Sequence, residues 1–279
     1  MLEQSEGRLR FLRRSSDPRR NKLRRGVYLL PSLLTMGNMF CGYACVVYAM
    51  RGEYATAAPF IGFAVVLDML DGRIARLTNT TSEFGVEFDS MADIISFGIA
   101  PAILSFAWGL QALGRLGWAA GFMFVAAAAM RLARFNIQSS SGGDKRYFVG
   151  MPSPAAAAIP AATVFAFPGG LTDYRAALPA LAMVLVPAAL MVSTIRFRSF
   201  KTIDSKARRP YTVLIFVAAG IVAIATHPQW TLVVIAYTYL LSAFVGMAIT
   251  RFNKQRGVAP APAADTAQPD ADRRDTAAR

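Results

Sequence analysis

The strongest constraint in this sequence is a series of apolar stretches, each about 20 residues long and nearly free of charge. A helix of that length crosses a hydrocarbon layer of ~30 Å. Hydrophobic residues make up 54% of the 279 positions and charged residues only 17%. A soluble domain of this length carries more charge and shorter apolar runs. The sequence therefore predicts an all-α polytopic membrane protein.

We expect about eight transmembrane helices, of which the fifth and the seventh are the shortest. Their approximate spans are 27–50, 53–78, 87–110, 114–138, 152–168, 173–195, 211–227 and 229–250. Residues 1–26 form a basic arm ahead of this transmembrane domain (27–250), and residues 251–279 form a tail. From about position 257 the tail is rich in alanine, proline and aspartate and lacks apolar periodicity, which predicts disorder.

The residues that give the net charge of +13 lie mostly outside the predicted spans or at their ends. Nine of the 30 Lys and Arg residues lie in positions 1–25, and most of the others flank apolar stretches. Up to position 256, 24 of them fall on the side that receives the arm, and only Arg51, Arg115 and Arg175 fall on the other. The positive-inside rule then places both termini in the cytoplasm. This pattern indicates topology and contact with anionic membrane lipids, and it argues against nucleic-acid binding.

Cysteine and histidine chemistry has little support. Cys41 and Cys45 lie four residues apart in the first apolar stretch, with no further Cys or His to pair with them. We interpret them as buried thiols without a disulfide or a zinc site. The single histidine, His227, lies in a short turn between two predicted spans, which disfavours a histidine-based catalytic triad.

Four aspartates interrupt the apolar pattern at one place. Asp68 and Asp71 are three apart at the end of the second predicted span, and Asp89 and Asp93 are four apart at the start of the third. These spacings put each pair on one face of its helix. The connection between the spans is short, so the helices should be antiparallel neighbours. We expect both pairs to converge near the cytoplasmic boundary.

Carboxylates gathered in a membrane need a positive partner. Arg73 and Arg76 are the only local cations and are fewer than the acids, which makes divalent metal the natural complement. Oxygen ligands favour Mg²⁺ or Mn²⁺, four carboxylates can hold two ions, and Mg²⁺ often completes its shell with substrate phosphates. The spacing therefore favours metal-dependent phosphoryl transfer. The alternative is a proton or cation path in a transporter.

Small residues beside the aspartates fit a phosphate site. Gly72, Ala75 and Gly85 leave space where a ligand or another backbone could approach, and Arg76 can bind a phosphate through two parallel donors. Plain helix packing is the alternative for the glycines. Transporters of this size commonly carry inverted repeats, and the absence of a second acidic cluster in residues 140–250 weighs against that class.

The spacing of this segment is more informative than its composition. Written out, it is Asp68-x2-Asp71-Gly72-x2-Ala75-Arg76-x8-Gly85-x3-Asp89-x3-Asp93. At each of these eight fixed positions it resembles the signature of the CDP-alcohol phosphatidyltransferases. The resemblance implies a six-helix core, with the acidic motif on the second and third helices, extended here by two more helices.

Three further stretches resemble the bacterial membrane-embedded phosphatidylserine synthases of that family. They are LPSLLTMGNMFCGY at 30–43, DSMADIISFGIAPA at 89–102, and RLARFNI at 131–137 followed by FVGMPSPAAAA at 148–158. The likeness implies transfer of the phosphatidyl group from CDP-diacylglycerol to the hydroxyl of L-serine, with release of CMP. It also implies a bacterial inner membrane location, a site at the cytoplasmic face, and a homodimer. Choline, glycerol phosphate or inositol phosphate are the alternative acceptors within the same fold.

The resemblance also implies roles for individual residues of the transmembrane domain. Asp68, Asp71, Asp89 and Asp93 would bind two divalent ions, and Asp93 would in addition be the general base. The motif positions implied to bind the CDP-diacylglycerol donor are Gly72, Ala75, Arg76, Ser82 and Gly85. Thr35 and Asn38 in the first helix are polar candidates for the nucleotide pocket or, alternatively, for helix–helix hydrogen bonds. Where relatives often carry asparagine, this chain has Ser32.

The acceptor pocket should offer a cation and polar groups, since serine carries both a carboxylate and an ammonium. Ser96 lies three residues beyond the last aspartate and thus on nearly the same helix face. Arg131 and Arg134 lie at the cytoplasmic end of the fourth predicted span and could bind a carboxylate or a phosphate. Topology and lipid headgroup contact are the alternative roles for both arginines. Asn136 and Lys145 complete the acceptor candidates.

Overall fold

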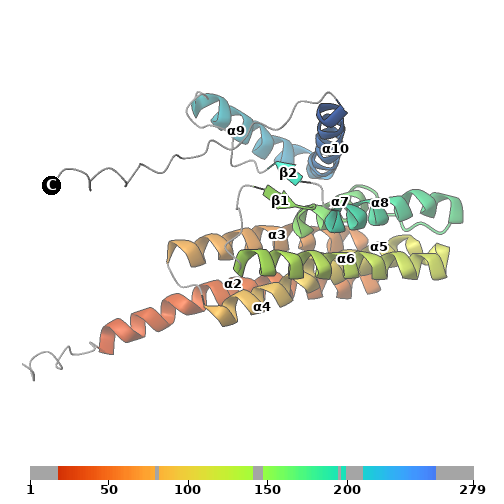
Figure 1. The fold of residues 1–279 in the computed structure, drawn as a ribbon. Helices are drawn as coiled ribbons and strands as arrows, with labels where there is room; N and C mark the ends of the chain where they lie inside the picture. The colour runs from red at the N-terminus through yellow and green to blue at the C-terminus, as the bar shows by residue number, and fades with distance from the viewer. Residues whose placement is uncertain (1–17, 79–81, 141–146, 194–195, 199–209, 256–279) are drawn as a thin grey trace, which may run out of the picture.

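The structure is a computed structural model that describes residues 18–78, 82–140, 147–193, 196–198 and 210–255 (Figure 1). Its α-helices are α2 (Pro18–Met50), α3 (Tyr54–Leu77), α4 (Glu83–Asp93), α5 (Ala100–Trp108), α6 (Arg115–Ser140), α7 (Ser153–Ala166), α8 (Tyr174–Val192), α9 (Pro210–Thr226) and α10 (Pro228–Gln255). A π-helix, η1 (Ile94–Ile99), joins α4 to α5, and a 3-10 helix, η2 (Leu110–Leu113), follows α5. Two short strands, β1 (Tyr147–Val149) and β2 (Arg196–Arg198), complete the described elements.

The prediction of an all-α polytopic membrane protein is confirmed. Each of the eight predicted helices corresponds to one observed segment, because α4, η1 and α5 run on as one stretch. Within the described residues, five segments are long and apolar enough to cross a membrane: Leu30–Met50, Tyr54–Leu77, Glu83–Trp108, Arg115–Gln138 and Tyr174–Val192. The fifth predicted span is a shorter apolar helix, Ser153–Ala166.

The first helix begins earlier than its hydropathy predicted. We expected it to start at residue 27, whereas α2 starts at Pro18 and includes the second part of the basic arm. Proline suits the first turn of a helix, and the Arg, Lys and Leu residues that follow are good helix formers. The apolar portion that can span a membrane still begins near the expected position, at Leu30.

The two strands were not predicted. β1 pairs antiparallel with β2, with Tyr147 opposite Arg198 and Val149 opposite Arg196. β1 lies in the connection between α6 and α7, and β2 lies in the connection between α8 and α9. Their pairing holds these two connections at the same end of the bundle (Figure 1), as the alternation of spans requires.

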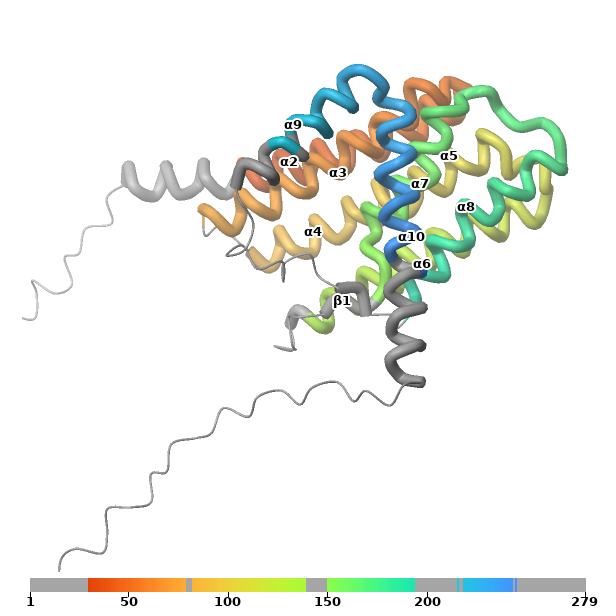
Figure 2. The backbone as a smooth tube through the Cα atoms, turned by 90° about the horizontal axis from the view of Figure 1, so that it is seen from above, coloured from red at the N-terminus to blue at the C-terminus, as the bar shows by residue number. Residues whose placement is uncertain are grey.

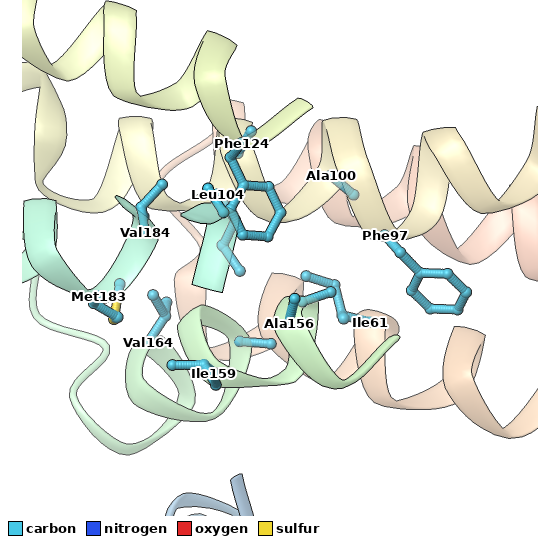
Figure 3. Close-up of a cluster of buried hydrophobic side chains, with 14 of the residues drawn as sticks. Ile61, Phe97, Ala100, Leu104, Phe124, Ala156, Ile159, Val164, Met183 and Val184 are labelled. Carbon is cyan, nitrogen blue, oxygen red and sulfur yellow. The ribbon is translucent and has the colours of Figure 1, made fainter. Parts of the chain in front are cut away.

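The core of the bundle is built largely from small side chains. Figure 3 shows its centre, where Ile61 of α3, Phe97 of η1, Leu104 of α5 and Phe124 of α6 face α7 and α8. Alanine recurs among the buried residues on most of these helices, and small residues let helix backbones approach closely in a membrane.

Helix α2 lies against both acidic helices. It packs chiefly on α3 and also contacts α4, η1 and α5. The last helix, α10, lies across α7 (Figure 2). The acidic ends of α3 and α4 therefore have α2 as a common neighbour.

The start of α7 is fixed by a tight contact with the end of α8. Gly150 has a φ of +87°, and a Cβ placed on it would lie 2.5 Å from the carbonyl oxygen of Met191. The next residue, Met151, is buried and donates its backbone N–H to the Leu190 carbonyl at 3.1 Å. This contact sets where Ser153, the first residue of α7, is placed.

Replacing Gly150 tests this contact. Gly150→Ala should lower the melting temperature in detergent because the new methyl group meets backbone, a steric cost of ~1–3 kcal/mol beyond the left-handed backbone penalty. Gly52→Ala is the matched control: Gly52 has a φ of +79° but nothing within 4 Å of its Cβ position. It should lose only the backbone part, ~1–2 kcal/mol. Equal losses in the two variants would contradict the close packing at Gly150.

Candidate active site

Three of the four aspartates converge as their spacing predicted. Asp68 and Asp71 lie in the last turns of α3, and Asp89 lies in α4. One carboxylate oxygen from each of these residues lies within 4.8 Å of the other two. Asp71 is buried, with 3% of its surface exposed, whereas Asp68 and Asp89 are partly buried. Three carboxylates at such distances repel one another unless a cation lies among them.

Asp93 lies next to this group of three carboxylates but does not belong to it. It is the last residue of α4, one turn beyond Asp89, and is partly buried. Its carboxylate interacts electrostatically with Asp68, Asp71 and Asp89. Its Oδ1 accepts a hydrogen bond from Asn38 Nδ2 at 3.4 Å. Asp93 is thus close to the three-carboxylate group, and its carboxylate is held by a residue of α2.

The start of α4 is set by Ser82. Its side chain is the N-cap and accepts the backbone N–H of Gly85 at 3.0 Å. Serine is among the preferred N-cap residues because its oxygen satisfies an amide that lacks a helical partner. A Cβ at Gly85 would lie 3.0 Å from Ser82 Oγ, so the glycine keeps this capping contact uncrowded. The cap fixes where the helix begins, and therefore where Asp89 and Asp93 fall on it.

The donor set fits a divalent metal. Among the described residues, three buried side-chain atoms lack a hydrogen-bond partner: Asn38 Oδ1, Asp89 Oδ1 and Arg131 Nε. A buried carboxylate oxygen without a partner is rare in folded proteins and indicates a missing ligand. Oxygen-only donors suit Mg²⁺ or Mn²⁺. Asp68, Asp71 and Asp89 are the residues that could share one ion.

The candidates for the nucleotide pocket fall into two groups. Gly72, Ala75 and Arg76 lie on the last turns of α3, with Arg76 exposed. A Cβ at Gly72 would lie 3.7 Å from Arg76 Nη2, so the guanidinium lies next to Gly72. Thr35 and Asn38 are instead buried inside the bundle, with 5% and 0% of their surfaces exposed. Each of them hydrogen-bonds an aspartate on another helix, as the helix–helix alternative expects, and their role in the nucleotide pocket stays a prediction.

Besides Arg131, three of the acceptor candidates have protein partners. Ser96 is fully buried and its hydroxyl donates to the Asn38 carbonyl at 2.9 Å. Arg134 Nη1 donates to the carbonyl of Val192 at the end of α8, at 3.3 Å. Asn136 Nδ2 donates to Ser90 Oγ at 2.9 Å. These contacts join helices, and Lys145 lies outside the described residues.

Arg131 is the acceptor candidate that faces the carboxylates. Its charge is near enough to Asp93 and Asp68 for electrostatic attraction. One nitrogen, Nη1, donates to Ser153 Oγ at 2.9 Å, and Nε has no hydrogen-bond partner among the described residues. The guanidinium therefore adds positive charge on the side of the acidic group, and such a planar donor suits an anionic ligand.

The comparison with protein families agrees with this arrangement. The family model for CDP-alcohol phosphatidyltransferase matches residues 28–195, which include all four aspartates and Arg131. The chain belongs to this family. It is an integral membrane phosphatidyltransferase with α9 and α10 beyond the matched region.

Three similar proteins share the same name. The CDP-diacylglycerol--serine O-phosphatidyltransferase of Helicobacter pylori (strain ATCC 700392 / 26695) is 39% identical over 197 residues, covering 69% of this chain and 81% of the relative. A protein of that name from Saccharomyces cerevisiae is 36% identical and covers 52% of this chain and 56% of its own length. The one from Bacillus subtilis is 34% identical, over 46% of this chain and 70% of its own length.

Two residues beside this phosphatidyltransferase site were missed by the sequence analysis. Ser153 lies within the FVGMPSPAAAA stretch that carried the resemblance, so a closer look at polar residues there would have found it. Tyr239 lies in an apolar span beyond the family match, and nothing local distinguishes it from a packing residue. It comes near Arg131 because α10 crosses α7.

Metal binding can be measured without substrate. Titrating detergent-solubilised protein with Mn²⁺ and following free Mn²⁺ by EPR should show binding to the wild type. Asp89→Asn should weaken that binding by at least about tenfold, because it removes a charge and one of three converging oxygen ligands. Glu87→Gln is the matched control, since Glu87 is an exposed acid on the same helix. Equal Mn²⁺ affinity in all three proteins would contradict a metal site at Asp89.

Proposed function

We propose that this protein transfers the phosphatidyl group of CDP-diacylglycerol to the hydroxyl of L-serine, giving phosphatidylserine and CMP. The observation that carries the proposal is the convergence of Asp68, Asp71 and Asp89, with Asp93 beside them. Membership of the CDP-alcohol phosphatidyltransferase family supports the reaction type. The relatives named for the serine reaction support the acceptor.

Metal would be held by the acidic group. Asp68, Asp71 and Asp89 would bind one divalent ion, and the four aspartates together would bind two. When bound, Mg²⁺ or Mn²⁺ would neutralise the pyrophosphate of the donor and favour departure of CMP. The carboxylates themselves exclude other anions from their immediate surroundings unless metal is present.

Asp93 would be the general base. The serine hydroxyl oxygen attacks the phosphorus that bears diacylglycerol, and its proton passes to the Asp93 carboxylate. A new P–O bond to serine forms as the P–O bond to CMP breaks, and CMP leaves with the electron pair. Proton removal by a positioned base contributes typically about 10²–10⁴-fold. An aspartate with a usual pKa of ~3.9 is a weak base, so its exact placement matters.

Donor and acceptor would approach from different helices. Gly72, Ala75 and Arg76 at the end of α3 would contact the nucleotide and its phosphates, together with the Ser82–Gly85 turn that starts α4. Arg131 on α6 would attract the serine carboxylate through the charge of its guanidinium. The electrostatic attraction between Arg131 and Asp93 supports a role for this cation near the proposed base.

The location of the site follows from charge. The excess of Lys and Arg on the side of the basic arm favours a cytoplasmic active site with both termini in the cytoplasm. There water-soluble serine and CMP can meet a lipid donor held in the membrane. A bacterial inner membrane location, contacts with anionic lipids and a homodimer remain predictions.

An acceptor panel tests the function directly. Purified protein in detergent with CDP-diacylglycerol and Mn²⁺ or Mg²⁺ should release CMP when serine is added and form a lipid that carries labelled serine. Choline, glycerol phosphate and inositol phosphate should give no comparable release, because the relatives named for this reaction use serine. Preferred release with one of these acceptors would overturn the serine assignment. No release with any acceptor would overturn phosphatidyl transfer.

Replacing the proposed base tests the mechanism. Asp93→Asn keeps the side-chain volume but cannot accept the serine proton, so kcat should fall by about 10²–10⁴-fold. The melting temperature should stay near that of the wild type, because the amide relieves repulsion from the neighbouring carboxylates. Glu53→Gln, at the N-cap of α3, is the control for loss of an acid outside the site. Wild-type kcat in Asp93→Asn would contradict the role of Asp93.

A further inference from the structure

Helix α2 contributes a row of residues that lies directly behind the acidic group. Thr35, Asn38 and Gly42 occupy positions i, i+3 and i+7, and thus one face of the helix. All three are buried, although each belongs to the apolar portion of a membrane-spanning helix. Polar side chains inside a membrane bundle are costly and usually functional.

Two of these residues hydrogen-bond aspartates on other helices. Thr35 Oγ1 lies 3.1 Å from Asp71 Oδ2 and 3.1 Å from the carbonyl of Pro31, so its single proton is shared between them. Asn38 Nδ2 donates to Asp93 Oδ1 at 3.4 Å. One helix therefore orients a carboxylate of the metal group and, separately, the proposed base.

The amide of Asn38 is oriented toward Asp93 although this leaves one of its own atoms unsatisfied. Asn38 has 0% of its surface exposed, and its Oδ1 has no partner among the described residues. The reverse orientation would place an amide oxygen against a carboxylate oxygen, which is repulsive. A buried acceptor without a partner weakens a fold, so the Asn38 amide costs stability through its Oδ1 while its N–H stabilises Asp93. Retaining asparagine here makes sense if its N–H is needed by Asp93.

The backbone around Asn38 is fixed against the segment that follows Asp93. The Asn38 carbonyl accepts the Ser96 hydroxyl at 2.9 Å. A Cβ at Gly42 would lie 2.7 Å from Ser96 Oγ and 2.8 Å from Ser96 Cα, so only glycine permits this approach. Ser96 lies in the π-helix η1, where the Ala100 N–H bonds to the Ile95 carbonyl five residues back.

Ser96 faces α2 from within the π-helix. π segments occur frequently at functional sites. Ser96 packs against α2, and Phe97 enters the core (Figure 3). Asp93, the last α-helical residue before η1, stays at the acidic group.

We propose that Asn38 is a positioning residue that holds the carboxylate of Asp93 in the orientation needed to take the acceptor proton. The Ser96–Gly42 contact fixes the distance between Asn38 and Asp93, and Thr35 holds Asp71 in the same way. This inference rests on the proposed function, because it assigns Asn38 to the base of that reaction. It differs from a role in the nucleotide pocket, since Asn38 has no exposed surface and its N–H is already donated to Asp93.

The test measures three quantities separately: kcat, the KM for the donor, and the melting temperature. Asn38→Leu keeps a similar volume and removes both amide groups. It should lower kcat by about 10–10²-fold, as expected when a catalytic group is displaced slightly. The KM for CDP-diacylglycerol should remain at the wild-type value, and the melting temperature should stay near that of the wild type, because loss of the donor to Asp93 is offset by removal of the unsatisfied Oδ1. If the leucine variant does not fold, Asn38→Ala removes the same amide without branching and carries the same expectation for kcat and KM.

Cys45→Ala is the matched control. Cys45 lies seven residues further along α2, on the same face, and is also fully buried. Its truncation leaves a cavity and should lower the melting temperature while kcat stays unchanged. This opposite pattern separates positioning of Asp93 from general packing of α2.

The outcomes distinguish this inference from the proposed function. If the wild type transfers phosphatidyl groups and Asn38→Leu keeps its kcat, the positioning role is overturned while the function stands. A raised KM with unchanged kcat would assign Asn38 to donor binding instead and also overturns positioning. Absence of CMP release by the wild type overturns both proposals.

Discussion

The four carboxylates at the ends of α3 and α4 determine much of how this bundle is arranged. Charge is costly in a membrane, so each acid needs compensation from the protein or from metal. Protein supplies part of it, through Thr35 at Asp71, Asn38 at Asp93 and the charge of Arg131. The described side chains do not supply the rest, since a buried oxygen of Asp89 has no hydrogen-bond partner among them. That deficit supports metal binding more directly than the number of acids does.

For α2 to compensate the charge of the carboxylates, α2 and η1 must approach each other closely. Gly42 allows α2 to contact the backbone of η1, and Ser96 of η1 donates to the Asn38 carbonyl. The polar contacts that orient the carboxylates are thereby buried on a rigid helix and protected from lipid. Exposed surfaces elsewhere on α2, such as Phe40 and Tyr43, are apolar or aromatic and suit contact with acyl chains. One helix thus separates the site from the bilayer and orients the acids within it.

Hydropathy was sufficient to predict the fold, because each span is a local property of about 20 residues. The convergence of Asp68, Asp71 and Asp89 was also predictable, since helical periodicity and a short connection determine it. The π-helix was not, because nothing in Ile94–Ile99 distinguishes it from an α-helix. The partners of Asn38 could not be predicted either, because they lie 55 and 58 residues away. Such pairings depend on how helices pack, and a single sequence contains no record of that.

This difference between local and distant residues also applies to the two halves of the site. The residues proposed to bind the donor and the metal lie in one continuous segment across α3 and α4, so a short motif can specify them. The surroundings of Arg131 come instead from α6, α7 and α10, through Ser153 and Tyr239. Tyr239 lies outside the region that the family model matches. A shared motif therefore fixes the phosphatidyl chemistry, while helices beyond the motif remain free to change the acceptor pocket. The choice of acceptor therefore depends on the environment of Arg131 rather than on the aspartates.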